Sequence, residues 1–378
     1  MAALVAASSQ AGAQQHGELL IWLAATPHAD GSPAELRWTH ETGGSIAGLE
    51  WLVEPELLLR RGQAVERGLH LRRAHVAAVG DAWQVRAGRQ LFDWSQTDTI
   101  SPADMLNPRD WSDITRIRKL PVTALSARYG NRASIEAVWI PHQQQSTLPA
   151  RDWLPPPVAA MLSPAQDHAT GSQSGLRVAG NWKQADLSVV WFRGHSVAPH
   201  VRLSDGPSLR ASYLPLQAFA LTMAKQIGAA NVVRAEVARY RQQGAPGYLR
   251  YVMSLDQEWA DVLSDGDTLY GILQYAGSTQ PDSAVNALGW PDFNRVLERS
   301  AMFKLNYDLG SDQRRVLELS GVYNTQRHDS LWQASWQQRV GNAMTVTIAG
   351  LAMRGKDDSF WGRVRGNRRV SLAVGWRY

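Results

Sequence analysis

The chain of 378 residues contains no cysteine, which excludes a disulfide framework and a thiolate metal site. It also has no run of about 18 apolar residues, so a helical membrane span is excluded. Lysine and arginine are scattered rather than clustered, and the net charge of +5 therefore does not indicate a nucleic-acid partner. Phenylalanine is scarce, with six residues against sixteen tryptophans. Tryptophan favours places with one apolar and one wet edge, such as membrane interfaces and sugar-binding grooves.

The end of the chain has the clearest pattern. The last nine residues alternate with period two, and one face of the strand carries Val370, Leu372, Val374, Trp376 and Tyr378. A transmembrane β-barrel needs strands that are apolar toward lipid and aromatic at the interface. The segment resembles the C-terminal strand of bacterial outer-membrane proteins, whose terminal aromatic residue is read by the barrel-assembly machinery. We therefore predict Trp376 and Tyr378 as the assembly signal, with that machinery and outer-membrane lipids as partners.

Seventeen further alternating runs precede this strand. They lie at about 17–25, 34–41, 49–60, 68–79, 82–90, 120–129, 132–140, 173–183, 186–195, 216–227, 232–241, 249–258, 267–276, 297–308, 314–323, 331–340 and 343–353. The predicted fold is all-β, a transmembrane antiparallel up-and-down β-barrel of about 18 strands, with 16 as the alternative. The least determined pairing is that of 26–66, because Pro55 interrupts a strand there.

The connections between these runs alternate in length. Several are tight and contain glycine, as at Gly80-Asp81 and Gly341-Asn342. The intervening long connections are 91–119, 141–172, 196–215, 277–296 and 354–368. Bacterial barrels have this asymmetry, with short periplasmic turns and long outer loops. We therefore expect a single barrel over 16–378 in a Gram-negative cell outer membrane, with a periplasmic N-terminus.

Residues 1–15 are rich in alanine and serine and include Ala11-Gly12-Ala13, which is typical of a secretory signal cleavage site. The basic n-region of such a signal is missing and its apolar core is short. We expect a residual signal-like leader that follows a misplaced start codon; a disordered leader is the alternative.

The polar faces of the strands carry charged residues that we expect to line a wet lumen. The lumen wall candidates are Arg86, Glu136, Arg177, Arg234, Glu236, Arg250, Asp256 and Glu318. On a lipid face near the midplane, an arginine would cost on the order of 2–4 kcal/mol. The alternative is a water-soluble antiparallel sheet with one solvated face.

The densest polar segment is the long connection 91–119, in which five carboxylates precede a basic cluster. The constriction and selectivity candidates are Asp93, Asp98, Asp104, Asn107, Arg109, Asp110, Asp113, Arg116, Arg118 and Lys119. Folded into the lumen, this loop would form a constriction with opposed charges that selects and orients solutes. The alternative is that these charges pair with the wall and lock the loop in place. A calcium site is not expected, because the glycine-bearing ligand loop is missing.

The same region carries motifs: Gly88-Arg89-Gln90, Trp94, D-x-L-N-P-x-D over 104–110 and L-P-V over 120–122. This arrangement is similar to a large proteobacterial family of porin-like outer-membrane barrels of unknown function, whose genes often lie beside lipid-type export pumps. The resemblance covers roughly 70–140 by motif. It implies a barrel fold and a place in a lipid or hydrophobe export route.

The sequence thus predicts an outer-membrane channel that passes small solutes through a polar lumen constricted by the 91–119 loop, with no catalytic residues, metal or cofactor. An outer-membrane component of a lipid or hydrophobe export system is the alternative. A third reading, a plugged surface enzyme or receptor barrel, would use a rim pair such as His328-Asp329. The cargo is accordingly an unidentified small solute or lipid.

Overall fold

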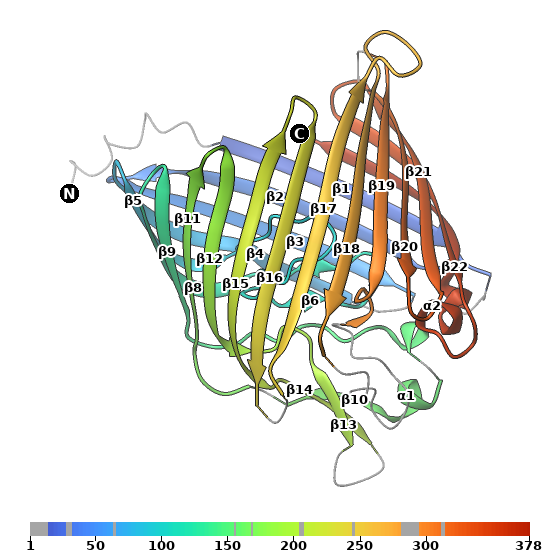
Figure 1. Ribbon diagram of the computed structural model, residues 1–378, viewed down its shortest axis with the longest axis horizontal. Coiled ribbons are helices and arrows are strands. Elements are labelled where there is room, and N and C mark those ends of the chain that lie inside the picture. The colour runs from blue at the N-terminus through green and yellow to red at the C-terminus, as the bar shows by residue number, and fades with distance from the viewer. Residues whose placement is uncertain are drawn as a thin grey trace.

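The computed structural model is a closed barrel of eighteen antiparallel strands (Figure 1). It describes residues 14–27, 32–62, 66–154, 156–167, 169–203, 208–243, 246–280, 295–310 and 314–378. The predicted leader lies outside the described residues except for Gln14 and Gln15, and so does most of the predicted loop 277–296. The predicted all-β antiparallel barrel is confirmed, with eighteen strands rather than sixteen.

Each strand forms where side chains alternate between two faces. The barrel strands are β1 (Gln14–Ala25), β2 (Ala34–Ile46), β3 (Leu49–Arg61), β4 (Glu66–Val79), β5 (Trp83–Gln90), β8 (Val122–Tyr129), β9 (Ala133–Ile140), β11 (Gln173–Trp182), β12 (Ala185–His195), β15 (Pro215–Ile227), β16 (Asn231–Gln242), β17 (Tyr248–Ala260), β18 (Thr268–Ser278), β19 (Ser300–Leu309), β20 (Arg315–Asn324), β21 (Ser330–Val340), β22 (Met344–Arg354) and β23 (Arg369–Arg377). The largest departure from the predicted runs is β2, which continues to Ile46. β1 begins at Gln14, so the predicted barrel start at 16 falls inside this strand.

Short and long connections alternate around the barrel, as the sequence predicts. The short turns and both barrel termini lie at one end, and the long loops lie at the other, at the bottom of Figure 1. The long loops hold small elements of their own: β6 (Arg109–Asp110), β7 (Arg118–Lys119), η1 (Arg151–Trp153), α1 (Pro156–Met161), β10 (Leu162–Gln166), β13 (His200–Leu203), β14 (Leu209–Ser212), α2 (Phe360–Arg363) and η4 (Arg365–Asn367). No helix within the described ranges is long and apolar enough to cross a membrane.

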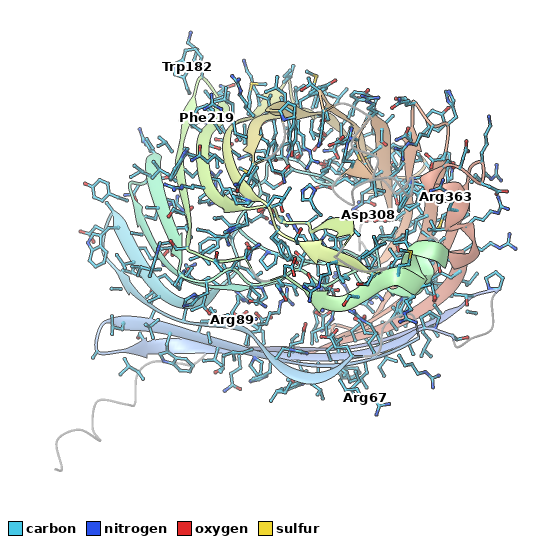
Figure 2. All side chains as sticks on the ribbon, turned by 90° about the horizontal axis from the view of Figure 1, so that it is seen from below. Arg67, Arg89, Trp182, Phe219, Asp308 and Arg363 are labelled. Carbon is cyan, nitrogen blue, oxygen red and sulfur yellow. The ribbon has the colours of Figure 1, made fainter. Side chains whose placement is uncertain are left out.

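The outer surface of the wall is apolar and bordered by aromatic residues at both ends. Figure 2 shows Trp182 and Phe219 on the outer side of the wall. Exposed aromatics near the long-loop end include Trp139, Trp191, Phe219, Tyr275, Tyr323 and Trp332. Those near the short-turn end include Trp83, Tyr129, Trp182, Trp259, Trp376 and Tyr378. This double belt is the pattern expected of a wall that faces lipid.

Pro55 does not break β3; it sits at a bulge. Glu54 pairs with Arg73 while Pro55 pairs with Leu71, so Arg72 is the extra residue of β4. A bulge can turn two successive side chains to the same face. Here Arg73 bonds Glu54, and Arg72 Nη1 lies 3.7 Å from Glu54 Oε1. The bulge therefore brings two neighbouring arginines to the lumen side.

The last residue closes the barrel against the first strand. β23 pairs with β1 from Val370 opposite Ala25 to Arg377 opposite Glu18, and Tyr378 exchanges backbone hydrogen bonds with Gly17 at 2.9 and 3.1 Å. The Tyr378 ring lies over Gly17, and its hydroxyl accepts a 2.6 Å hydrogen bond from Trp38 Nε1. The terminal strand is therefore both the outward aromatic strand that the sequence predicts and part of the closing seam.

Gly17→Val should weaken this seam. A Cβ atom at position 17 would lie 2.1 Å from Tyr378 Cζ, so the ring must leave its place. Overpacking of this kind costs about 1–3 kcal/mol, which should appear as a lower melting temperature in detergent and partial loss of the fast-migrating unheated gel band. Gly350→Ala is the matched control, since its Cβ position is open. Equal melting temperatures for wild type and Gly17→Val would contradict this role.

Candidate functional site: the lumen and its inserted loop

The connection between β5 and β8, residues 91–121, folds into the barrel; we call it the inserted loop. Its apolar side chains Phe92, Trp94, Met105 and Leu106 are buried against the inner faces of β8, β9, β12, β15 and β16. The wall residues beneath them are apolar too: Val122, Ala124, Val138, Ile140, Val190, Phe192, Leu216, Ala218, Ala220 and Ala238. This half of the wall is therefore not the uniformly polar lining that the sequence predicts; the inserted loop covers it.

The two ends of the inserted loop are held together by one side chain. Asn107 is fully buried, its Oδ1 accepts from Phe92 N at 2.9 Å, and its Nδ2 donates to Leu120 O at 2.8 Å. Gln90, at the end of β5, likewise donates to Ala124 O at 2.8 Å. Both are residues of the motifs found in the sequence. Their observed role is to fix the conformation of the loop.

Glu236 on β16 anchors the far side of the loop. Its Oε1 accepts from Gln96 N at 2.6 Å and from both the backbone and the hydroxyl of Thr97 at 2.9 and 3.0 Å. Its Oε2 accepts from Ser101 Oγ at 2.5 Å and Ala103 N at 3.2 Å. Glu236 is only 2% exposed, so this predicted lumen wall residue binds the loop instead of lining open water.

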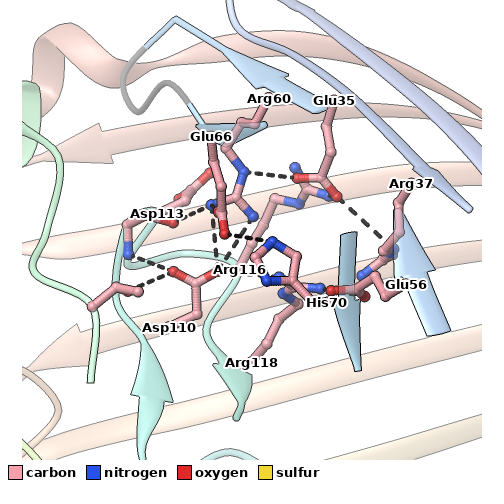
Figure 3. A network of polar contacts seen from close by, with 12 residues as sticks. Glu35, Arg37, Glu56, Arg60, Glu66, His70, Asp110, Asp113, Arg116 and Arg118 are labelled. Carbon is pink, nitrogen blue, oxygen red and sulfur yellow. Dashed lines mark hydrogen bonds and ion pairs between the residues drawn. The ribbon is translucent and has the colours of Figure 1, made fainter. Parts of the chain in front are cut away.

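Charged side chains fasten the loop to the opposite wall (Figure 3). Arg60 of β3 lies 3.2 Å from Glu35 and 3.3 Å from Asp110, and it donates to Ser112 Oγ at 2.5 Å. Arg118 lies between two carboxylates, 3.3 Å from the same Asp110 and 3.0 Å from Glu56 of β3. Because β3 and β16 lie on nearly opposite sides of the barrel, the loop crosses the lumen between them.

Two further pairs extend this attachment to the closing seam. Arg116 lies 3.5 Å from Glu35 and stacks over the Trp22 ring of β1 at 4.2 Å. Asp113 forms an ion pair with Arg369 of β23 at 2.7 Å. The inserted loop thus joins β1, β2, β3 and β23 on one side to β16 on the other.

Within the loop, Asp104 is buried between two cations. Arg109 and Lys119 each lie 2.6 Å from it, and Lys119 also reaches the exposed Asp93 at 2.8 Å. Asp98 is exposed. Most of the predicted constriction residues therefore form internal ion pairs that lock the loop, and Asp93 and Asp98 present carboxylates to solvent.

Asp110 lies in the inserted loop, outside the barrel strands. Burial by itself would raise the pKa of Asp110, but the charge of Arg60, hydrogen bonds from Ser112 and Thr147 and the charge of Arg118 outweigh it. Together they hold the pKa of this carboxyl well below its usual range. Burial lowers the pKa of Arg116 in the same network, and Glu35 and Asp113 oppose that effect.

The depressed pKa of Asp110 predicts an acid dependence. The ionised carboxylate stabilises the fold above the ordinary pKa of 3.8, and this contribution is lost as the pH falls toward the folded value. Asp110→Asn should therefore melt below wild type at neutral pH, and the gap should narrow as the pH drops below about 4. Melting curves from neutral to acid pH test this, with the exposed Asp98→Asn as control. A gap that stays constant with pH would show that Asp110 is not the titrating group.

A cavity of about 510 Å³ lies on the long-loop side of the inserted loop. Charged residues on its wall are Asp93, Asp98, Asp104, Arg109, Lys119 and Arg250, and apolar ones include Met105, Ile114, Ile117, Leu297 and Trp361. Outward of it, the loops 141–172, 196–214 and 355–368 pack together through Trp153, Leu154, Leu209, Phe360 and Trp361; we call this the cap. Trp111 and Ile114 of the inserted loop pack against the cap.

The other predicted wall residues also lie on inner faces. Arg234 pairs with Asp256, whose Oδ2 accepts from Tyr270 Oη at 2.7 Å. Glu318 lies 3.4 Å from Lys304, and Arg250 lies 2.8 Å from Glu298. Glu136 accepts a hydrogen bond from Trp94 Nε1 at 2.9 Å, and Arg177 lies directly opposite Glu136 in the register of β11 and β9. Arg86 donates a hydrogen bond to Gln84 at 3.1 Å.

Sequence reasoning missed the carboxylates and arginines of β2, β3 and β4. Glu35, Glu54, Glu56 and Arg60 all face inward, and Arg60 connects most of the network of Figure 3. The available signal was the even-numbered spacing of Glu54, Glu56 and Arg60, two and then four residues apart, which places all three on one face of a strand. Pro55 between them obscured it.

The rim pair His328-Asp329 contacts the cap through Asp329. Asp329 is buried and accepts from Trp361 N at 2.8 Å, and burial raises its pKa. His328 contacts Tyr323 Oη at 2.9 Å. Among the described residues, no three histidine or carboxylate side chains lie close enough to hold a metal ion.

Comparison with known proteins places the fold among solved barrels. No family model and no curated protein matches the sequence, so the resemblance of its motifs to a family stays a prediction. Similar structures include OccK11 (OpdR) of Pseudomonas aeruginosa, with a TM-score of 0.57 and 9% identity over 97% of this chain and 95% of that one. OccAB1 of Acinetobacter baumannii has a TM-score of 0.56 and 8% identity, covering 98% and 96%. OccD3 (OpdP) of P. aeruginosa has a TM-score of 0.56 and 8% identity, covering 97% and 91%. At this identity the likeness concerns the fold alone.

Proposed function

We propose that this protein is an outer-membrane channel for small hydrophilic solutes, with the inserted loop as its constriction. The long loops face the cell exterior and the short turns and both barrel termini face the periplasm. The apolar outer wall with its two aromatic belts supports the membrane location. The polar pairs on the inner faces support an aqueous path through it.

The observation that carries this proposal is the crossing of the lumen by the inserted loop. Barrels of 16–18 strands are wide enough to leave an aqueous channel unless something fills it. Here a loop fixed to Arg60 on one wall and Glu236 on the other narrows that space without covering every wall residue. A solute that has passed the cap from the long-loop side meets the cavity before the constriction, and Asp93, Asp98 and Lys119 present charges of both signs there.

Liposome swelling tests the channel directly. Liposomes that contain the refolded barrel should swell in isotonic solutions of small amino acids and monosaccharides and resist larger oligosaccharides, because the inserted loop limits the opening. Liposomes with the heat-denatured protein are the control. Failure to swell in any of these solutes would sink the proposal.

The export route implied by the motif resemblance is the second candidate. The observation in its favour is the apolar side of the cavity, where Met105, Ile117 and Trp361 lie. A fluorescent fatty acid should then bind the detergent-purified barrel and bind more weakly to Met105→Asp, whereas Met105→Asp should not change probe binding to a hydrophilic channel.

A further inference from the structure

A patch of three arginines lies on the outer face of the barrel, far from the lumen. We call Arg193 of β12 and Arg239 and Arg241 of β16 the arginine patch; all three are exposed. Their outward direction follows from the alternation of each strand. Phe192 is buried beneath the inserted loop, and Tyr240 donates to Pro102 O of that loop at 2.6 Å. The residues next to them must therefore face out.

The strand register brings the three arginines together. Arg193 pairs with Gln217 of β15, and Gln217 pairs in turn with Arg241. Arg193 and Arg241 thus lie two strands apart, about 10 Å, and Arg239 lies about 7 Å along the strand from Arg241. The three arginines therefore border one area of the outer face, with Gln217 between Arg193 and Arg241.

This area lacks a matching negative charge. In the described parts of β9 to β17, every aspartate and glutamate faces the lumen, and the outward positions carry none. Three uncompensated cations close together would repel one another. They favour an anionic ligand that comes from outside the chain.

The location of the arginine patch indicates which kind of anion it can bind. It lies near the long-loop ends of its strands, and the exposed rings Trp191 and Phe219 adjoin it on the side of the apolar wall. An arginine at a bilayer midplane costs about 2–4 kcal/mol, but near the interface the cost falls to about 0–1 kcal/mol. A single molecule that contacts both the arginine patch and the rings of Trp191 and Phe219 must have an anionic head and apolar chains.

We propose that the arginine patch binds the phosphate groups of an anionic lipid in the leaflet on the long-loop side. The planar guanidinium groups suit phosphate oxygens, which they bind in pairs of hydrogen bonds. Trp191 and Phe219 contact the upper part of the acyl chains. This inference rests on the membrane location given under Proposed function, but not on the channel.

Bisphosphorylated lipid A is the probe, since it carries two phosphates on an acylated sugar head. The full chain, refolded in an uncharged detergent, should retain this lipid in native mass spectrometry and melt at a higher temperature with it. The triple variant Arg193→Gln, Arg239→Gln, Arg241→Gln should bind at least about tenfold more weakly, and Arg241→Gln alone should show a smaller loss. Lys225→Gln, on the outward face of β15 at the short-turn end, should bind as wild type does.

Three results would overturn the proposal. They are equal lipid retention by the triple variant and wild type, equal retention of dephosphorylated lipid A, and an equal rise in melting temperature with inorganic phosphate at the same ionic strength. The unheated gel band shows whether the triple variant has folded, and the single variant provides the same comparison if it has not. Conductance of the triple variant should match wild type, so loss of lipid binding and failure of the channel are separate outcomes.

Discussion

Replacing Glu236 with leucine should raise the single-channel conductance several-fold and make the current noisy. The substitution leaves five hydrogen-bond donors of the inserted loop without their acceptor, and each buried unsatisfied group costs about 1–3 kcal/mol. The segment 96–103 should then leave the wall of β16. A loop that keeps its apolar packing but has lost its carboxylate anchor on β16 would no longer narrow the lumen in one fixed position.

Glu318→Leu is the matched control for this variant. Glu318 also faces the lumen from a barrel strand, but its partner is Lys304, not the inserted loop. Its conductance should change slightly through charge alone. If Glu236→Leu conducts as wild type does and melts at the same temperature, Glu236 does not hold the constriction.

Replacing Arg60 with alanine should have the largest effect on stability. Glu35 and Asp110 are each buried to a few per cent exposure; Glu35 loses its nearest cation, and Asp110 loses one of the two arginines that lie 3.3 Å from it. Breaking a buried pair by removing one partner costs about 3–5 kcal/mol. The loss should be near the lower end, because Arg116 still approaches Glu35 and Arg118 still approaches Asp110.

A double variant separates the lost ion pair from general damage to β3. In Arg60→Ala with Asp110→Asn, the unpaired carboxylate at 110 is gone, so the double variant should be more stable than the sum of the two single losses implies. Arg61→Ala is the control, because Arg61 is exposed. Strictly additive losses, measured as free energies of unfolding in urea, would show that Arg60 and Asp110 are not coupled.

The strand count and the sorting of the loops were predictable because both depend on local patterns. Alternation with period two determines which residues face out, and a register shift of one residue would move every side chain of the strand to the other face. The outward aromatic face ending at Trp376 and Tyr378 is confirmed for the same reason. A closed barrel also places the terminal strand beside the first strand, near Gly17 to Ala25, and the structure confirms this pairing. The alternation does not determine the packing of the Tyr378 ring over Gly17, because that depends on the side-chain conformation.

The roles of the charged residues could not be predicted to the same degree. Alternation places Glu236 on the inner face, but it does not tell whether water or a loop lies there. That depends on how the inserted loop folds, through contacts such as those of Asn107 with Phe92 and Leu120. At Arg72 the bulge breaks the alternation itself, so this arginine reaches Glu54 from a position that the pattern assigns differently.

If the proposed function is right, water and ions pass through a lumen narrowed by a fixed loop. The most direct measurement is the current across a planar bilayer after the refolded wild-type barrel is added. We expect discrete steps of uniform, small conductance that persist at low voltage, because ion pairs on two walls hold the inserted loop in one position. No current steps at any voltage, with the protein shown to be inserted, would contradict the channel.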